Sequence, residues 1–303
     1  MQFDRVIRAK IFLTRTTPEG NPNPSAVYRG DIDITNLRIA FTINKSQAWS
    51  TNTAQVRIYN LGVDNRNRLK EFGDNLRLYA GYRGEDGAQL LFTGNITQFN
   101  HTFAQPDIIT YLECGDGDNI LNNSTISVSF TAKTQVREVI ETIASKMGLN
   151  IVDFADTGNR SYDNGFNDCG LGKDILDVAC KKANLRWSVQ NENLIIIPDN
   201  GSTIRPPVEI NEDTGMIGIP ERYVDKKQFL YKALPPNNAP KPGWRVKALL
   251  RPDLLPGDRI RLRSVKANVS GVFTILTIRH EGDNYGPIFE SILEVFPNDN
   301  YLS

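Results

Sequence analysis

Apolar and polar residues alternate along the first third of the chain. In NLRIAFTI (36–43), Leu37, Ile39, Phe41 and Ile43 fall on one face, and polar or small residues fall on the other. Similar patterns follow in AQVRIYNL, LRLYAGY and LLFTGNITQF, separated by Gly, Asn and Asp. This period of two predicts antiparallel strands that form a small barrel or a sandwich.

The period changes near residue 131. Five apolar residues recur at the spacing of one helical face, namely Val136, Val139, Ile140, Ile143 and Met147. This spacing predicts a helix, with Thr134 as its N-terminal cap and Gly148 as the left-handed residue that follows its end.

A second helix is predicted in GLGKDILDVACKKAN, with Ile175, Val178 and Ala179 facing inward and Asn184 ending it. The strand patterns LRWSV and LIIIP follow, and the Gln-Asn-Glu-Asn between them is typical of a hairpin turn. Residues 125–200 are therefore predicted to form a small α/β module.

The last third returns to strand patterns and repeats a phrase from the first third. GDNLRL (73–78) reappears as GDRIRL (257–262), and each copy is followed by a turn and a strand that closes on a histidine. These histidines, His101 and His280, are the only two in the chain. The repeat predicts a duplicated β-domain, with two unrelated hairpins as the alternative.

The predicted fold class is mainly β with an inserted α/β module. Two β-barrel domains, 1–124 and 201–303, flank the small α+β domain at 125–200. Two proline-rich stretches, Thr14–Gly30 and Ala233–Gly243, are interpreted as long loops, one in each β-domain. Because proline reduces the entropy lost on ordering, at least one of them is expected to pack on a neighbouring protein.

Composition narrows the class of protein. A chain of 303 residues suits two or three domains, and its 35 basic residues balance 35 acidic ones. This balance gives no electrostatic case for a dedicated nucleic-acid or membrane binder. The first residues do not fit a signal peptide, and no apolar run is long enough to cross a bilayer. Three cysteines without a C-x-x-C pair indicate reduced thiols, and with two histidines they are too few for a zinc site.

The histidines are weak candidates for catalysis. His280-Glu281-Gly282-Asp283 could form an acid–base set, but a polar turn between two strands is the preferred interpretation. No motif places a Ser, Cys or Asp beside His101, which is expected at the surface where a strand ends.

Two glycine-containing motifs are incomplete. CGDGDN (114–119) lacks the ligand series and closing Glu of a calcium loop and is interpreted as a turn. GLGKD (170–174) lacks the spacing of a phosphate loop, has Asp174 after its lysine and follows no predicted strand, so nucleotide binding is rejected.

The cysteines and tryptophans add no site. Cys169 and Cys180 are expected to be buried structural thiols, since neither histidine is placed near them. Trp49, Trp187 and Trp244 are too dispersed to form a stacking platform. No catalytic, cofactor-binding or metal-binding residue is therefore predicted.

Several stretches together resemble one family. NLRIAFTINKSQAWSTNTAQVRIYNL (36–61) resembles the N-terminal barrel of tail baseplate hub proteins from contractile-tailed phages, which are related to the hub portion of type VI secretion spikes. TQVREVIETIASKMGLN and LGKDILDVACKKANLRWSVQNENLIII resemble their inserted α/β module. TGMIGIPE, LLRPDLLPGDRIRL and SGVFTILTIRHEGD resemble their second barrel, so the similarity extends over about residues 30–296.

The resemblance implies a structural role in a virion baseplate, with assembly in the host cytoplasm. Such hubs are homotrimers whose subunits each carry two tube-like barrels, so six similar barrels surround a channel and join the six-fold tail tube to the three-fold central spike. The implied partners are the tube ring, the spike and other baseplate proteins, with the tape measure protein as a further candidate. Genomic DNA would pass through the lumen without specific binding, and no membrane insertion is expected.

The chain is predicted not to be an enzyme. Some hub complexes carry a fused lysozyme, but no segment of that size is left over and no carboxylate pair stands out. Two alternatives remain, a tail-associated enzyme that degrades the cell wall and uses the His280 turn, and a β-rich carbohydrate-binding module.

Overall fold

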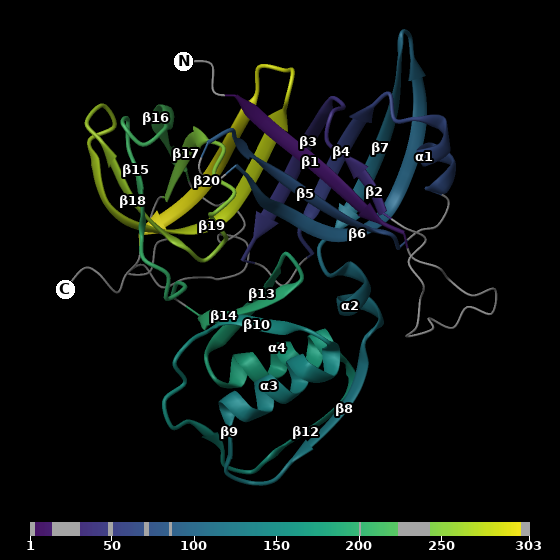
Figure 1. Cartoon of the computed structure of the whole chain (residues 1–303). Coiled ribbons are helices and arrows are strands. Elements are labelled where there is room, and N and C mark those ends of the chain that lie inside the picture. Colours follow the sequence, from purple (N-terminus) through teal and green to yellow (C-terminus); the bar gives the residue numbers. More distant parts are fainter. Residues whose placement is uncertain are drawn as a thin grey trace.

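The computed structural model describes residues 4–13, 31–47, 51–69, 73–84, 87–199, 201–223 and 243–297. The predicted fold class is confirmed, because the described chain is mainly β and a small α/β segment lies below a large sheet in Figure 1. The predicted loop at 14–30 lies outside the described residues, as does all of the loop at 233–243 except Gly243.

The large sheet contains thirteen described strands. Its first half, purple to blue in Figure 1, consists of β1 (Arg5–Phe12), β2 (Asp31–Ile34), β3 (Ile39–Ser46), β4 (Thr53–Tyr59), β5 (Asn75–Tyr82), β6 (Ala88–Ala104) and β7 (Asp107–Gly115), with the short helix α1 (Val63–Arg68). Its second half, green to yellow, consists of β15 (Val208–Ile210), β16 (Met216–Tyr223), β17 (Gly243–Leu249), β18 (Arg259–Ser264), β19 (Val269–Asp283) and β20 (Phe289–Pro297).

The two halves repeat one strand order. The first half has the order β3-β4-β7-β6-β5, and the second half has the order β16-β17-β20-β19-β18. The Gly-Asp phrase precedes β5 and β18 in the same geometry, since Gly73 and Gly257 have φ of +98° and +96°. Their N–H groups donate to the carbonyls of Ile96 and Ile275, at 3.1 and 2.9 Å. Shared order and shared turn geometry confirm the predicted repeat of these strands.

The repeats are joined edge to edge. Thr277–Asp283 of β19 pairs antiparallel with Ala40–Ser46 of β3, while the first part of β19 pairs with β18 on the same side. The sheet therefore continues from one repeat into the other. Leu250 and Phe289 of the second repeat also belong to the apolar cluster of the first, so this joint is packed as well as hydrogen-bonded.

The middle segment has three small sheets and three helices among the described residues. Its elements are α2 (Asp118–Asn123), β8 (Thr125–Phe130), β9 (Thr134–Gln135), α3 (Val136–Met147), β10 (Asn150–Phe154), β11 (Ser161–Tyr162), β12 (Phe166–Leu171), α4 (Gly172–Lys182), β13 (Leu185–Gln190) and β14 (Asn193–Pro198). The sheets are β10-β14-β13, β8-β12 and β9-β11. In the described part of the chain, no helix is long and apolar enough to cross a membrane.

The helix predictions are confirmed in position and wrong in detail. All five residues of the predicted α3 face are buried, and Gly148 follows the helix with φ of 77°. Thr134 does not cap α3, because its hydroxyl donates to Thr131 O and Gln135 occupies the cap position. Val178 was predicted to face inward but is exposed on α4. The buried face of this helix is formed instead by Ile175, Leu176, Ala179 and Cys180.

Candidate functional site

His280 is a core residue. It lies inside β19 with 0% of its surface exposed, because β3 and β20 flank it on both sides. Arg251 N donates to Ser291 Oγ at 2.9 Å, and the same hydroxyl forms a hydrogen bond with His280 Nδ1 at 2.8 Å. Burial lowers the pKa of His280 well below 6.5 and keeps the ring neutral. The predicted polar turn is wrong, and this ring cannot reach a substrate.

His101 occupies the equivalent place in the first repeat. Its Nδ1 lies 3.1 Å from Thr110 Oγ1 on β7, as the His280 ring lies beside Ser291 on β20. It is half-buried within β6, which continues to Ala104, so the predicted strand end is also wrong. The two repeats therefore share a histidine–hydroxyl contact at equivalent positions, in addition to their common strand order.

CGDGDN forms a turn, as predicted, but its Asp116 has a role that the sequence did not indicate. The Asp116 carboxylate is 0% exposed and accepts hydrogen bonds from Asn191 N and Glu192 N, both at 2.7 Å, and from Asn52 Nδ2 at 3.0 Å. Asn191 and Glu192 form the predicted turn between β13 and β14, with φ of 54° and 62°. Burial raises the pKa of Asp116 to about 6. These hydrogen bonds connect the β13–β14 hairpin of the middle segment to the residue that follows β7.

Lys45 of β3 reaches the same turn. Its ammonium group is buried and donates to Asn191 Oδ1 at 3.1 Å. Burial lowers the pKa of Lys45 to about 8, and the charge of Asp116 opposes that shift. Gln190 Nε2 also donates to Ser46 O at 2.9 Å. This polar network therefore holds the hairpin against the strand that joins the two repeats.

The GLGKD motif has a structural position. It spans the end of β12 and the start of α4, so a strand does precede it, contrary to prediction. Lys173 Nζ donates to Asn122 Oδ1 of α2 at 2.9 Å, which ties two helices together. Among the residues that the structure describes, no group of three His, Cys, Asp or Glu side chains could hold a metal ion.

The cysteines differ from each other. Cys180 is buried in α4, as predicted, and burial raises the pKa of its thiol. Cys169 is exposed on β12, contrary to prediction. Trp187 and Trp244 are buried in separate clusters, and Trp49 lies outside the described residues.

The outer part of β6 is an open sheet edge. On one side β6 pairs with β7 as far as Ala104, but on the other side it pairs with β5 only from Ala88 to Asn95. Beyond Asn95, no described strand pairs with β6 on that second side. Phe103 lies on this segment with 76% of its surface exposed. We call Gln98–Ala104 the β6 edge.

A second open edge lies at the end of the sheet. β16 pairs with β17, and no other strand in the described ranges pairs with it. Its register shifts between Ile217 and Glu221, at a bulge that contains Gly218 with φ of +73°. Ile219, in that bulge, is 54% exposed. We call Met216–Tyr223 the β16 edge.

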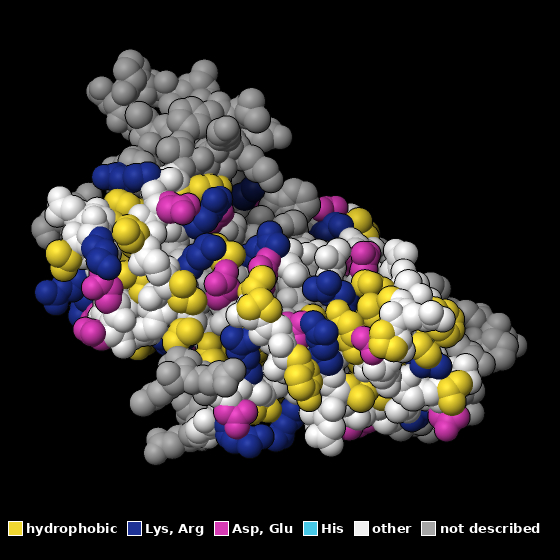
Figure 2. Space-filling model, turned by 90° about the horizontal axis from the view of Figure 1, so that it is seen from above, with side chains coloured by type: hydrophobic (Ala, Val, Ile, Leu, Met, Phe, Trp, Pro, Cys, Tyr) yellow, Lys and Arg dark blue, Asp and Glu magenta, His cyan; other side chains and the backbone are white. Residues whose placement is uncertain are grey.

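One face of the sheet is polar across both repeats. The pairing registers bring together on it Arg57 and Glu113 of the first repeat and Arg245, Lys247, Arg279, Glu281, Glu290 and Glu294 of the second. Arg245 and Lys247 form ion pairs with Glu294 and Glu290, at 2.9 and 3.8 Å. Figure 2 likewise shows basic and acidic side chains intermingled over the described surface seen from above. Neither sign dominates this polar face.

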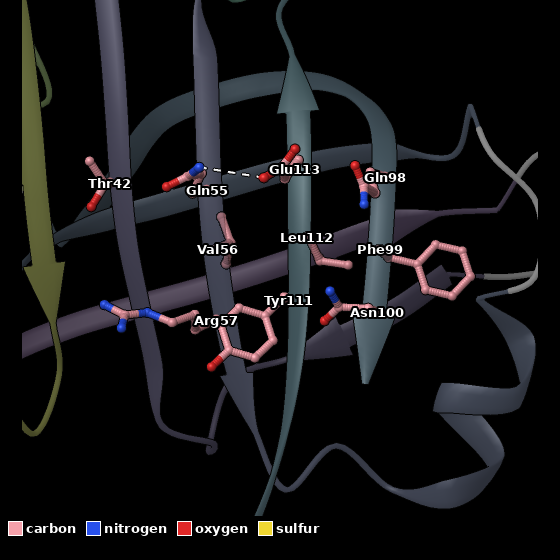
Figure 3. A pocket seen from close by; sticks show the side chains of 10 residues that line it. All are labelled: Thr42, Gln55, Val56, Arg57, Gln98, Phe99, Asn100, Tyr111, Leu112 and Glu113. Carbon is pink, nitrogen blue, oxygen red and sulfur yellow. Dashed lines mark hydrogen bonds between the residues drawn. The ribbon is translucent and has the colours of Figure 1, made fainter. Parts of the chain in front are cut away.

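A shallow hollow of about 330 Å³ lies on the polar face of the first repeat, as shown in Figure 3. Most of its lining side chains are polar and come from four strands, including Thr42, Gln55, Asn100, Tyr111 and Glu113. Gln55 Nε2 donates to Glu113 Oε1 at 3.5 Å, and no histidine or cysteine lines the hollow. Its lining is therefore predominantly polar.

Solved structures share this fold at low sequence identity. A 43 kDa tail protein of prophage MuSo2 from Shewanella oneidensis matches with a TM-score of 0.63 and 9% identity, over 97% of this chain and 99% of that one. A tail protein from Neisseria meningitidis MC58 matches with a TM-score of 0.62 and 11% identity, over 95% and 96% of the two chains. The E. coli c3393 protein, a component of the type VI secretion system, matches with a TM-score of 0.55 and 11% identity, over 86% and 73%.

Sequence comparison identifies the family. No curated protein matches the chain. The family model of the baseplate hub gp41 matches residues 26–223, which is more than half of the 303 residues. The chain therefore belongs to the baseplate hub gp41 family.

Proposed function

We propose that three copies of this chain form a ring on the axis of a phage-type tail baseplate, between the hexameric tail tube and the trimeric central spike. The observation that carries this proposal is the pair of equivalent repeats in one continuous sheet. Two repeats in each of three chains make six similar units, which suits a six-fold neighbour on one side and a three-fold neighbour on the other.

The proposal divides the chain into three units. Residues 1–124 and 201–303 are the two tube-like barrels, and residues 125–200 are the module inserted between them. Three separate clusters of buried apolar side chains support this division. The module is held against the sheet by Asp116 and its partners rather than by a continuous apolar core.

The polar face is proposed to line the central channel. Its interspersed charges would let DNA pass without the strong attraction that a basic surface exerts on phosphates. The tube ring, the spike, other baseplate proteins and the tape measure protein are the proposed partners, with assembly in the host cytoplasm.

A non-enzymatic role fits the positions of the candidate residues. The acid–base set considered for cell-wall degradation needs an accessible His280, and that ring is buried and neutral. The described tryptophans offer no stacking surface for a carbohydrate-binding module, because Trp187 and Trp244 are buried in separate clusters.

Cryo-electron microscopy of intact tails tests the proposal directly. We expect three copies of the chain around the tail axis, in contact with the last tube ring above and the spike below. Six copies per baseplate, or a position on the periphery away from the axis, would overturn the proposed function.

A further inference from the structure

We propose that the side chains of Lys45 and Asn191 react with each other to form an isopeptide bond, an amide between Lys45 Nζ and Asn191 Cγ, with release of ammonia. The bond joins β3, the strand through which the two repeats meet, to the turn between β13 and β14 of the middle segment. This modification of the chain is independent of the proposed ring.

The two reacting groups are already in contact. Lys45 Nζ lies 3.1 Å from Asn191 Oδ1, the oxygen bonded to the carbon that the amine attacks. Asn191 is also held in place through its backbone, because its N–H donates to Asp116 at 2.7 Å and its carbonyl accepts from Asn193 Nδ2 at 2.9 Å. Such positioning replaces the encounter of two separate molecules with a step inside one molecule, and so raises its rate by orders of magnitude.

The surroundings of Lys45 favour the neutral amine. Its side chain is 2% exposed, Ile278 lies opposite it on β19, and its described acceptor, Asn191 Oδ1, carries no charge. Burial therefore lowers the pKa of Lys45 to about 8. Because the neutral amine is the nucleophile in amide formation, this burial activates Lys45.

Asp116 is the proton carrier. Its carboxylate is 0% exposed and bonds the backbone of Asn191, the residue whose amide nitrogen must leave. Burial raises the pKa of Asp116 to about 6, so the pKa values of the acid and of Lys45 are much closer than their ordinary values of 3.8 and 10.5. A proton then passes from Lys45 to Asp116 inside the buried site, directly or through one water molecule, at a small cost in free energy.

The atoms and protons of the reaction balance. The lone pair of the neutral Lys45 Nζ forms the new bond to Asn191 Cγ, and the bond from Cγ to Nδ2 breaks with its electron pair on the nitrogen. Asp116 gives its proton to the departing Nδ2 and takes one from Nζ, so it ends protonated as it began. The products are a secondary amide and ammonia, and the step needs no further reactant.

The product relieves an unfavourable burial. A buried lysine ammonium held by an uncharged acceptor destabilises the folded chain, whereas the amide that replaces it is neutral. The new bond also closes a loop between residues that are 146 positions apart in the sequence. A cross-link of this span stabilises a fold by restricting the unfolded chain.

The chain contains a matched pair that should stay unlinked. Lys173 Nζ donates to Asn122 Oδ1 at 2.9 Å, which is the same contact between the same two residue types. This pair is exposed to solvent, so it differs from Lys45 and Asn191 in burial. We therefore expect a cross-link at Lys45 and none at Lys173.

Mass spectrometry of the purified full-length chain tests the proposal. After prolonged incubation of the folded chain at neutral pH, its intact mass should be lower than the mass of the sequence by one molecule of ammonia. Because cyclisation of a glutamine or asparagine also releases ammonia, digestion with trypsin must locate the change in a branched peptide that contains Lys45 and Asn191. Trypsin should also fail to cleave after Lys45, since it requires a charged side chain there.

Three variants separate the chemistry from the fold. Lys45→Met removes the nucleophile and keeps a long side chain, and Asn191→Gly removes the amide at a position where φ is 54°. Neither variant should contain the branched peptide. Asp116→Asn keeps a hydrogen-bonding side chain but has no acidic proton to transfer, so it should form the bond about a hundredfold more slowly.

The wild-type chain alone decides the main question, so the test does not depend on whether a variant folds. If the wild-type chain is folded by circular dichroism and keeps its full mass throughout the incubation, the proposal is wrong. A branched peptide that forms equally from Lys173 and Asn122 would also overturn it, because burial would then have no part in the reaction. Bond formation in Asp116→Asn at the wild-type rate would overturn the role assigned to Asp116.

Discussion

Replacing Asp116 by alanine is expected to loosen the attachment of the middle segment to the sheet. The Asp116 carboxylate accepts three hydrogen bonds, two of them from the backbone N–H groups of Asn191 and Glu192. Both of those residues have left-handed backbone conformations, which a bound acceptor helps to hold. Without the carboxylate, both N–H groups lose their acceptor in a partly buried site.

The magnitude follows from the lost acceptor. A buried donor left without a partner costs about 1–3 kcal/mol, so two such donors give a range of roughly 2–6 kcal/mol. Removal of a buried negative charge offsets part of this loss at neutral pH, where Asp116 is ionised. We expect the free energy of unfolding to fall by about 3 kcal/mol at pH 5 and by less at pH 7.

The pH dependence has a defined sign. The folded pKa of Asp116, about 6, is above its ordinary value of 3.8, so the folded chain binds this proton more tightly than the unfolded chain. The resulting contribution to stability is complete below pH 3.8 and is lost as the pH rises through 6, by up to about 1.4 kcal/mol per pH unit. The alanine variant has no such proton, so the difference in stability between the two proteins shrinks from pH 5 to pH 7.

Urea unfolding followed by tryptophan fluorescence measures this difference, because Trp187 lies on β13 beside the hairpin turn. Asp163→Ala, at an exposed aspartate of the same segment, is the control and should change stability by about 0.5 kcal/mol or less. A loss below about 1 kcal/mol at pH 5, or an equal loss at both pH values, would refute the role assigned to Asp116.

Two further predictions concern the repeats. His280→Asn keeps a hydrogen-bonding side chain beside Ser291 but removes a ring whose folded pKa is well below 6.5. It should therefore abolish the acid sensitivity of this group, which costs the wild type up to about 1.4 kcal/mol per pH unit as the pH falls below 6.5. Equal pH slopes of the urea midpoint in both proteins would contradict a neutral buried ring. Gly73→Ala and Gly257→Ala should each cost about 1–2 kcal/mol because of their positive φ, with Gly84→Ala as a control outside that region. Gly257→Ala should lower the thermal midpoint of unfolding more than Gly73→Ala does. The new Cβ at residue 257 would lie 3.3 Å from Thr203 Cγ2, whereas a Cβ at residue 73 would meet no atom within 4 Å. The reverse order of the two midpoints would argue against the described turn geometry.

Local periodicity was sufficient to predict the individual elements. The five α3 residues are all buried because a period of 3.6 reports which side of a helix faces the core. Val178 was misplaced because Leu176 and Cys180 define an inward face of α4 that is rotated from the predicted one. β12 was missed because FNDCGL has little strand preference, and its extended form depends on pairing with β8.

Long-range pairing could not be predicted from the sequence. The sequence around His280 is typical of a polar turn, but the residue is buried between β20 and β3, and β3 lies more than two hundred residues earlier in the chain. Asp116 reads as one of several acidic turn residues, and its function depends on the hairpin turn at residues 191–192. The repeat was visible because both copies kept the glycine whose positive φ the turn requires.

The edge-to-edge joint has a consequence for how the chain is made. β3 leaves the ribosome early, but its partner β19 is more than two hundred residues further along. At typical rates of synthesis the delay is roughly 10–50 s, during which the β3 edge has no cover from its own chain. An exposed strand edge is a site of aggregation, so we expect the nascent first repeat to need protection until β19 is made. Truncated chains that stop before β19 are for the same reason expected to accumulate as aggregates rather than as soluble half-hubs.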